Sequence, residues 1–228
     1  MFSLFDVRRL SYLIDRFFLQ KAMVKKTLIT RFGLLRHART VWNQEKRIQG
    51  QKDSPITSEG RKQATVCGKI LNSLSWHRIL SSDTGRALET ANIINKYLQV
   101  SILKDSRLRE QDWGLWTGKT LGSISKKRSQ GLAAQAGIGW RFCPPEGEDR
   151  LAVWQRSQQA LKETAKKRPG AKILVVTHEG VIKCLLYRLC GRRFLPSEPP
   201  IIQPYHLHWL SYDGRQLRVE ELNALALY

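Results

Sequence analysis

The chain has 228 residues, of which 42% are hydrophobic, and a formal net charge of +20 at pH 7. This length can bury one sizeable core but is short for two full domains, and the charge favours anionic partners such as phosphates, acidic metabolites, nucleic acid or an anionic membrane. No segment approaches the roughly eighteen consecutive apolar residues of a membrane span. Four cysteines without a CxxC pair indicate reduced thiols and a cytoplasmic location.

Residues 1–22 are expected to lie outside the domain. Their apolar residues recur at helical spacing opposite a basic face and are Val7, Leu10, Ile14, Phe17 and Phe18. This pattern predicts an N-terminal extension that is helical, either docked or lying on a membrane surface. The alternative is a mistaken upstream start, because Met23 would serve as a natural beginning. We therefore expect a single domain over residues 23–228.

From Met23 onward, apolar runs alternate with amphipathic stretches, which predicts a parallel sheet covered by helices on both faces. The expected strands cover residues 28–35, 78–82, 101–103 and 172–177. The expected helices run over residues 58–75, 85–98, 148–167 and 179–190. Thr57 or Ser58 is suited to cap the first of these helices.

The chain then ends in a predicted hairpin, with strands from His206 to Tyr212 and from Arg215 to Leu222. Asp213 and Gly214 are predicted to form a two-residue turn between them, because this pair favours positive φ angles. Residues 120–147 are rich in Gly, Ala, Ser and Lys, which predicts a variable lid or insertion. We therefore expect an α/β fold, a three-layer α/β/α sandwich with a mixed but mainly parallel sheet that the hairpin closes on one side.

Chemically useful residues follow several of these strands. Arg36 and His37 come after the first strand, Arg86 after the second, and His178 after the strand over 172–177. Because the carboxyl ends of parallel strands meet at one crevice, we expect these side chains to converge. Guanidinium groups match phosphate oxygens and imidazole offers a nucleophile. Glu110 would be the acid that protonates a departing oxygen in phosphoryl transfer.

Six segments in chain order resemble motifs of the histidine phosphatase superfamily, in its phosphoglycerate mutase-like branch. They are Leu35-Arg36-His37, Trp42-Asn43 with Ile48-Gln49-Gly50, the stretch 53–60, the stretch 81–87, Leu108-Arg109-Glu110 with Trp113-Gly114 and Gly118, and the stretch 176–180. The resemblance covers the chain from about residue 28 to its end. Ala38 departs from it, since the family usually has Gly there; a methyl group is tolerable if the backbone is not left-handed.

The resemblance implies roles for these residues. His37 would be the nucleophile, with Arg36, Arg86 and His178 holding the phosphoryl oxygens, while Glu110 protonates the leaving alcohol and then deprotonates water. The two arginines should favour the neutral form of His37. Secondary phosphate contacts would come from Thr40, Asn43, Gln49 and Gly50. The resemblance implies no cofactor and no metal, and no Cys/His/Asp cluster has ligand spacing.

Three functions remain open at this stage. A phosphomonoester phosphatase acting through a phosphohistidine is favoured, because residues 110–119 are similar to the phosphatase members. Phosphoglycerate mutases, the second hypothesis, tend to have a histidine and a tyrosine after the acid and a longer insertion. A polyanion-binding protein is the third, supported by the net charge and opposed by the complete catalytic set.

The expected partner is a small phosphomonoester whose identity the sequence does not give. Aromatic residues are not interleaved with the basic runs, so nucleic acid is not the expected ligand. A homo-oligomer is allowed but not indicated. Trp113 and Trp116 are equally suited to line a substrate pocket or to fill the core.

Overall fold

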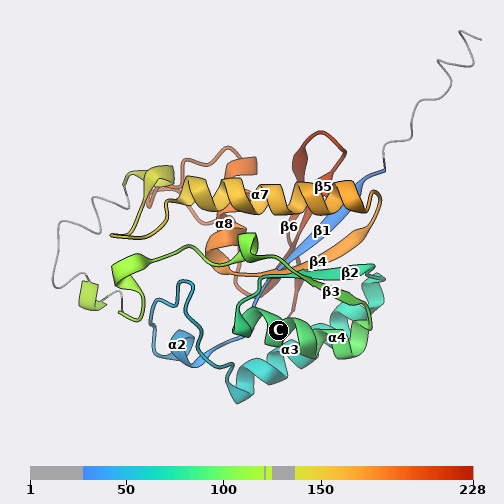
Figure 1. Ribbon diagram of the computed structural model, residues 1–228, viewed down its shortest axis with the longest axis horizontal. Helices are drawn as coiled ribbons and strands as arrows, with labels where there is room; N and C mark the ends of the chain where they lie inside the picture. The colour runs from blue at the N-terminus through green and yellow to red at the C-terminus, as the bar shows by residue number, and fades with distance from the viewer. Residues whose placement is uncertain (1–27, 121, 125–136, 228) are drawn as a thin grey trace, which may run out of the picture.

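The computed structural model describes residues 28–120, 122–124 and 137–227. In this part of the chain a single sheet has helices on both faces (Figure 1). One face is covered by α7 (Arg150–Lys167) and α8 (Glu179–Leu189). The other face is covered by α3 (Ser58–Leu71) and α4 (Gly85–Leu98). The three-layer α/β/α sandwich is therefore confirmed. The short α2 (Val41–Gln44) follows the first strand.

The sheet has the strand order β3-β2-β4-β1-β5-β6. Its strands are β1 (Thr30–Arg36), β2 (Arg78–Ser81), β3 (Ser101–Lys104), β4 (Lys172–Thr177), β5 (His206–Tyr212) and β6 (Leu217–Ala226). The first four are parallel to one another, whereas β5 is antiparallel to β1 and to β6. The mixed, mainly parallel sheet with a C-terminal hairpin at one edge is thus as predicted.

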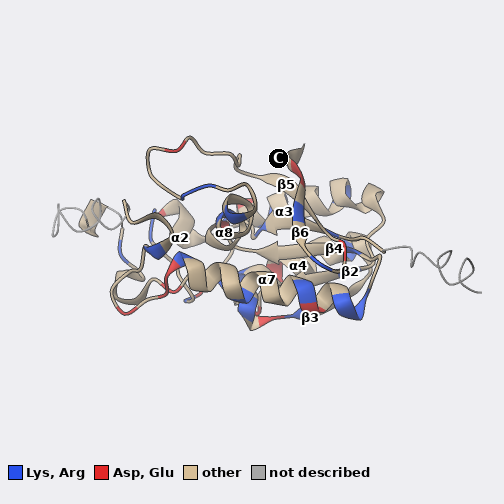
Figure 2. Cartoon of the chain, turned by 90° about the horizontal axis from the view of Figure 1, so that it is seen from above, with Lys and Arg blue, Asp and Glu red and all other residues tan. Residues whose placement is uncertain are grey.

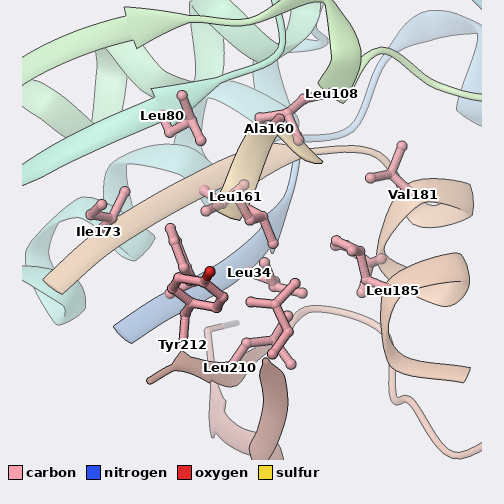
Figure 3. Close-up of a cluster of buried hydrophobic side chains, with 14 of the residues drawn as sticks. Leu34, Leu80, Leu108, Ala160, Leu161, Ile173, Val181, Leu185, Leu210 and Tyr212 are labelled. Carbon is pink, nitrogen blue, oxygen red and sulfur yellow. The ribbon is translucent and has the colours of Figure 1, made fainter. Parts of the chain in front are cut away.

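The central strands β1 and β4 are covered on both faces, which is why their sequences are almost continuously apolar. Alternate residues point to opposite layers. Leu34 and Ile173 pack with side chains of α7 and α8 in the larger cluster, shown in Figure 3. Leu35 and Leu174 pack with α3 and α4 in the second cluster. Burial of both faces fixes the register of these two strands, and with it the residues that follow them.

Several boundaries follow from local signals in the sequence. The hydroxyl of Thr57 accepts a hydrogen bond from the backbone N–H of Gly60 and caps α3, as predicted. That helix ends at Leu71 and continues as one 3₁₀ turn, η1 (Asn72–Leu74). Further 3₁₀ turns are η2 (Ser106–Leu108), η3 (Gly114–Trp116) and η4 (Gly139–Arg141). Asp149 caps α7, so this helix begins two residues later than predicted.

The predicted two-residue turn of the hairpin is wrong. Residues 213–216 form the connection, and β6 extends to Ala226 instead of ending at Leu222. Within the connection Gly214 has a φ of 91°, but Asp213 does not have a positive φ. The Asp213 carboxylate instead accepts hydrogen bonds from the backbone N–H groups of Arg215 and Gln216, both at 2.9 Å. Such a side-chain turn replaces the tight turn that the Asp-Gly pair suggested.

The predicted extension at residues 1–22 lies outside the described residues, as do residues 125–136 of the predicted lid. The described part of that segment includes Ile124 and Phe142, which pack with Trp116 in a small apolar cluster. None of the helices over the described residues is long and apolar enough to cross a membrane.

Candidate active site

The carboxyl ends of β1 and β4 bring the two predicted histidines together. Arg36 lies opposite Thr177 in the parallel register, and the backbone N–H of His37 donates to the Thr177 carbonyl at 2.9 Å. The next residue along β4 is His178, whose ring centroid lies 5.2 Å from that of His37. Strand pairing therefore positions both imidazoles.

The hydrogen bonds of His37 fix its tautomer. Its Nδ1 lies 2.8 Å from the carbonyl oxygen of Ala38, which can only accept, so Nδ1 carries the proton. Its Nε2 lies 3.3 Å from Nε of Arg86, which can only donate, so Nε2 has no proton and its lone pair accepts this hydrogen bond. Burial, followed by the charges of Arg36 and Arg86, holds the pKa of His37 well below its usual range. The ring is thus neutral at pH 7, as predicted.

Ala38, where the family usually has Gly, is accommodated. It is not among the residues with positive φ. Its methyl group packs with Ile56 and Ala64. The expectation that a methyl group is tolerable at this position is therefore met.

Arg86 is the buried centre of the site, and all five of its N–H groups have acceptors. These are the carbonyls of Gly50 and Lys52, the carboxylate of Asp53, and the rings of His37 and His178, at distances from 2.7 to 3.3 Å. A guanidinium with this many contacts has one orientation. It orients both histidines and the loop that contains Gly50.

Asp53 is a contributor whose role the sequence did not indicate. Its carboxylate accepts from the backbone N–H groups of Gly85 (2.6 Å) and Arg86 (3.2 Å) as well as from the Arg86 guanidinium. It therefore caps α4 from a distant loop and holds Arg86 at the first turn of that helix. Asp53 begins the stretch 53–60 that resembles a family motif, but its contact with Arg86, 33 residues away, was not predicted.

His178 is fully buried at the N-cap of α8. Its Nδ1 accepts from Arg86 at 3.1 Å, and its Nε2 lies 2.9 Å from the Ser82 hydroxyl and 3.3 Å from that of Thr84. Burial and then Arg86 lower its pKa well below the usual value, so this ring is neutral too. In this geometry His178 positions Arg86; the direct phosphate contact implied for it stays a prediction.

Arg36 lies at the end of β1 and pairs with Glu179, whose carboxylate is 2.5 Å away. Glu179 also accepts from Lys183 one turn along α8, at 2.6 Å. Burial raises the pKa of this carboxyl, but Arg36 and Lys183 outweigh that effect and lower it. Glu179 is a second acid at the site that was not among the predicted residues, although it follows His178 directly.

The candidate acid Glu110 lies against the first turn of α8. Its carboxylate accepts from the backbone N–H groups of Gln111 (2.8 Å) and Gly180 (3.2 Å). A Cβ at Gly180 would lie 2.2 Å from Oε1 of Glu110, so a side chain there would displace the carboxylate. Glycine at this position is what allows the acid to approach the helix N-terminus.

Arg156 on α7 holds the backbone on which Glu110 lies. It donates to the carbonyls of Arg107, Arg109 and Glu110 at 2.6 to 3.1 Å. The same guanidinium forms a bidentate pair with Glu148, at 2.7 and 2.8 Å. Neither residue belongs to a motif singled out in the sequence, because their effect is on main-chain atoms of a distant loop.

These elements border a cavity of about 510 Å³. Among the predicted residues, those lining it are Arg36, His37, Asn43, Gln49, Gly50, Arg86 and Glu110, together with Trp113. Thr40 does not line it: its hydroxyl accepts from the Asn43 backbone N–H at 3.3 Å and caps α2. Trp116 is buried in the core. Lysine and arginine residues lie beside α2 and on α8 (Figure 2), and both regions contribute to the cavity wall.

Comparison with known proteins agrees with this arrangement. The model of the histidine phosphatase superfamily (branch 1) matches residues 32–225. The probable phosphoglycerate mutase GpmB of Klebsiella pneumoniae is 34% identical over 167 residues, which is 69% of this chain and 74% of that protein. YhfR of Bacillus stearothermophilus has a TM-score of 0.78 at 33% identity, covering 87% of this chain and 98% of that chain.

A mycobacterial glucosyl-3-phosphoglycerate phosphatase, in a complex with VO3, has a TM-score of 0.76 at 28% identity and covers 86% of this chain and 99% of its own. The family model extends over most of the chain and includes the strand ends that form the site. The chain therefore belongs to branch 1 of the histidine phosphatase superfamily.

Proposed function

We propose that this protein is a metal-independent phosphatase that hydrolyses a phosphomonoester through a phosphohistidine on His37. The observation that supports this most is the fixed tautomer of His37, in which Nε2 has no proton. His37 lines the same cavity as Glu110. A neutral imidazole with its proton on the far nitrogen is ready to attack phosphorus without first losing a proton.

In the first step Nε2 of His37 forms a bond to phosphorus while the bond from phosphorus to the ester oxygen breaks. Glu110 gives its proton to that oxygen, so the product leaves as a neutral alcohol. The positive charge that develops on the ring is stabilised by the hydrogen bond from Nδ1–H to the Ala38 carbonyl. When Nε2 of His37 bonds to phosphorus, it no longer accepts from Nε–H of Arg86, and this donor together with Arg36 stabilises the negative charge on the phosphoryl oxygens.

In the second step water attacks phosphorus, Glu110 takes one proton from it, and the bond to Nε2 breaks, which returns neutral His37 and releases phosphate. Glu110 has to be protonated when substrate binds. Contacts with the backbone N–H groups of Gln111 and Gly180 hold its carboxyl group at the cavity.

Phosphoryl transfer of the mutase type is the second candidate, because relatives that are 34% to 37% identical are named probable phosphoglycerate mutases. The two reactions share the phosphohistidine and differ in its acceptor. Incubation with a phosphomonoester and a second alcohol distinguishes them: a phosphatase releases inorganic phosphate, whereas a mutase moves the phosphoryl group to another hydroxyl.

The experiment that tests the proposal is turnover of a panel of phosphomonoesters by the full chain. We expect inorganic phosphate release by the unchanged protein in the presence of a metal chelator, and its loss in His37→Ala. His77→Ala is the matched control, because His77 lies at the other end of the sheet, where its Nδ1 accepts from the Lys172 backbone N–H. Equal turnover by His37→Ala and His77→Ala would refute the proposal.

A further inference from the structure

Arg150, the first residue of α7, lines the cavity but has no role in the phosphoryl chemistry above. Its guanidinium lies against two phenyl rings, 4.4 Å from the centroid of Phe142 and 3.9 Å from that of Phe194. Phe194 in turn contacts the rings of Trp140 and Tyr187, with centroids 5.1 and 4.7 Å away. Two aromatic rings therefore pack against the guanidinium, whose N–H groups lie along its edge.

The hydrogen bonds of Arg150 leave part of that edge unused. Nη1 donates to the carbonyls of Gly139 and Phe194, each at 3.1 Å. Among the described residues no carboxylate pairs with Arg150, and no acceptor lies on its Nε or Nη2. Arg150 is half-buried, so part of the residue is accessible to solvent. A half-buried charge without a counter-ion is costly unless a ligand supplies one.

Arg150 is nevertheless a cation under physiological conditions. Burial lowers its pKa to about 10, which is still well above neutral pH. Phe194 adopts a left-handed backbone conformation, with φ of 62°, and so presents both its ring and its carbonyl to the guanidinium. Strained backbone of this kind persists only where surrounding contacts hold it. The guanidinium is thus held in one orientation.

Among the described residues around the cavity, the other cations are paired or exposed, which distinguishes them from Arg150. Glu179 pairs with both Arg36 and Lys183, and the phosphoryl group of the substrate would face Arg86. Lys46 and Arg47 also line the cavity but are exposed, where solvent screens their charge. Among the described residues that line the cavity, the half-buried cation that remains without a counter-ion is Arg150. A cavity of about 510 Å³ has room for more than a phosphoryl group beside it.

We propose that Arg150 forms a second anion subsite, so that the preferred substrates are phosphomonoesters with a carboxylate or a second phosphoryl group. This inference rests on the proposed function. The phosphoester is held at the strand ends, and the second anion accepts hydrogen bonds from the open edge of Arg150. Substrates without such a group leave that edge to water and bind less well.

The test compares two pairs of primary phosphates. One is 3-phosphoglycerate against glycerol 3-phosphate, which differ by a carboxylate; the other is fructose 1,6-bisphosphate against fructose 6-phosphate, which differ by a phosphoryl group. The measured quantity is the ratio of kcat/KM within each pair. We expect the ratio to exceed one in the unchanged protein and to fall by about 10- to 100-fold in Arg150→Met for whichever pair has the right anion.

Arg188→Met is the matched control. Arg188 is also placed over an aromatic ring, 5.6 Å from the centroid of Trp140, but does not line the cavity. The substitution removes the same charge and should leave both ratios unchanged. Arg150→Lys keeps the charge without the planar fork and should give an intermediate fall of several-fold. If Arg150→Met does not fold, the Lys variant decides the question.

A binding experiment tests this inference independently of the proposed function. In a His37→Ala background, calorimetry measures the dissociation constants of 3-phosphoglycerate, fructose 1,6-bisphosphate and their partners without turnover. A selective loss of affinity for the member with the second anionic group on adding Arg150→Met supports the subsite even if the protein proves to be no phosphatase. An unchanged ratio, or an equal loss for both members of each pair, would show that Arg150 only supports the aromatic residues and would overturn the inference.

Discussion

The cavity has one buried and one half-buried arginine, Arg86 and Arg150, which are held in different ways. Arg86, on the floor formed by the ends of β1 and β4, has acceptors for all five of its N–H groups. Arg150 lies with Phe194 on the part of the cavity lining that we call the far wall, and it is held by contacts with two phenyl rings and by the hydrogen bonds of one nitrogen. The floor is a fully connected network suited to fixed chemistry, while the far wall leaves donors free for a variable part of the substrate.

The largest effect is expected from Arg86→Met, which should lower kcat by roughly 10³- to 10⁵-fold because the phosphoryl charge loses its buried cation. The loss should be similar for every phosphomonoester, unlike the selective effect at Arg150. Removal of one partner from a buried network also costs about 3–5 kcal/mol of stability, measured by denaturant unfolding.

Arg31→Met is the control for that prediction. Arg31 forms a solvent-exposed pair with Glu220 at 3.2 Å, so its loss should change the free energy of unfolding by no more than about 1 kcal/mol. If Arg86→Met lost no more stability than Arg31→Met, the hydrogen bonds around Arg86 would not stabilise the fold as one network.

Glu110→Gln should lower kcat for alkyl phosphates by about 10²- to 10⁴-fold, since an amide cannot protonate the leaving oxygen. Aryl phosphates such as p-nitrophenyl phosphate, whose leaving group needs little protonation, should lose much less. Steady-state kinetics on one substrate of each kind measures the difference. Equal losses on both would remove Glu110 from the role of general acid.

Gly180→Ala should lower kcat by roughly 10- to 100-fold, because the new methyl group displaces the Glu110 carboxylate from the N-terminus of α8. The effect should again be greater for alkyl than for aryl phosphates. Gly122→Ala is the control, since a Cβ there has no atom within 4 Å. A Gly180→Ala protein with full activity on alkyl phosphates would show that the carboxylate has another stable position.

The smallest effect concerns stability at mildly acidic pH. Burial lowers the pKa of His37 and His178, and lowers that of His208 to about 4, so these rings stay neutral when folded and gain protons when unfolded near their ordinary pKa of about 6.5. Their contribution is therefore present above pH 6.5 and is lost as pH falls, by about 1 kcal/mol for each histidine between pH 7 and 5.5.

Denaturant unfolding at pH 7 and 5.5 measures this change, above the range where most carboxylates titrate. His208→Gln should reduce the loss by about 1 kcal/mol, because one of the three protons is no longer taken up. A free energy of unfolding that is constant over this interval would contradict the prediction that His37, His178 and His208 are neutral in the folded protein.

The floor could be predicted from the sequence because it follows from strand order. Arg36, His37 and His178 come directly after apolar runs, and parallel pairing makes such residues neighbours. The supporting residues Asp53 and Arg156 could not be found in this way. They bind main-chain atoms of segments distant in sequence, and such contacts leave no periodic pattern.

The far wall was not predictable for a related reason. Arg150 and the residues that contact it come from η4, the start of α7 and the loop around Phe194. None of these segments follows a strand end. Arg150 is one of many arginines in a strongly basic chain, so its charge gave no signal. Arg150 differs from the exposed basic residues in its contacts with two phenyl rings, which only the folded chain brings together.

The central claim is that His37 is the phosphoryl acceptor, and the most direct test is to stop turnover and isolate the phosphoenzyme. We expect a modification that is labile in acid and stable in alkali, as a phosphorus–nitrogen bond is, and that peptide mass spectrometry places on His37. It should be absent from His37→Ala and present in His77→Ala. A phosphoryl group that is stable in acid, or one that persists in His37→Ala, would contradict the account.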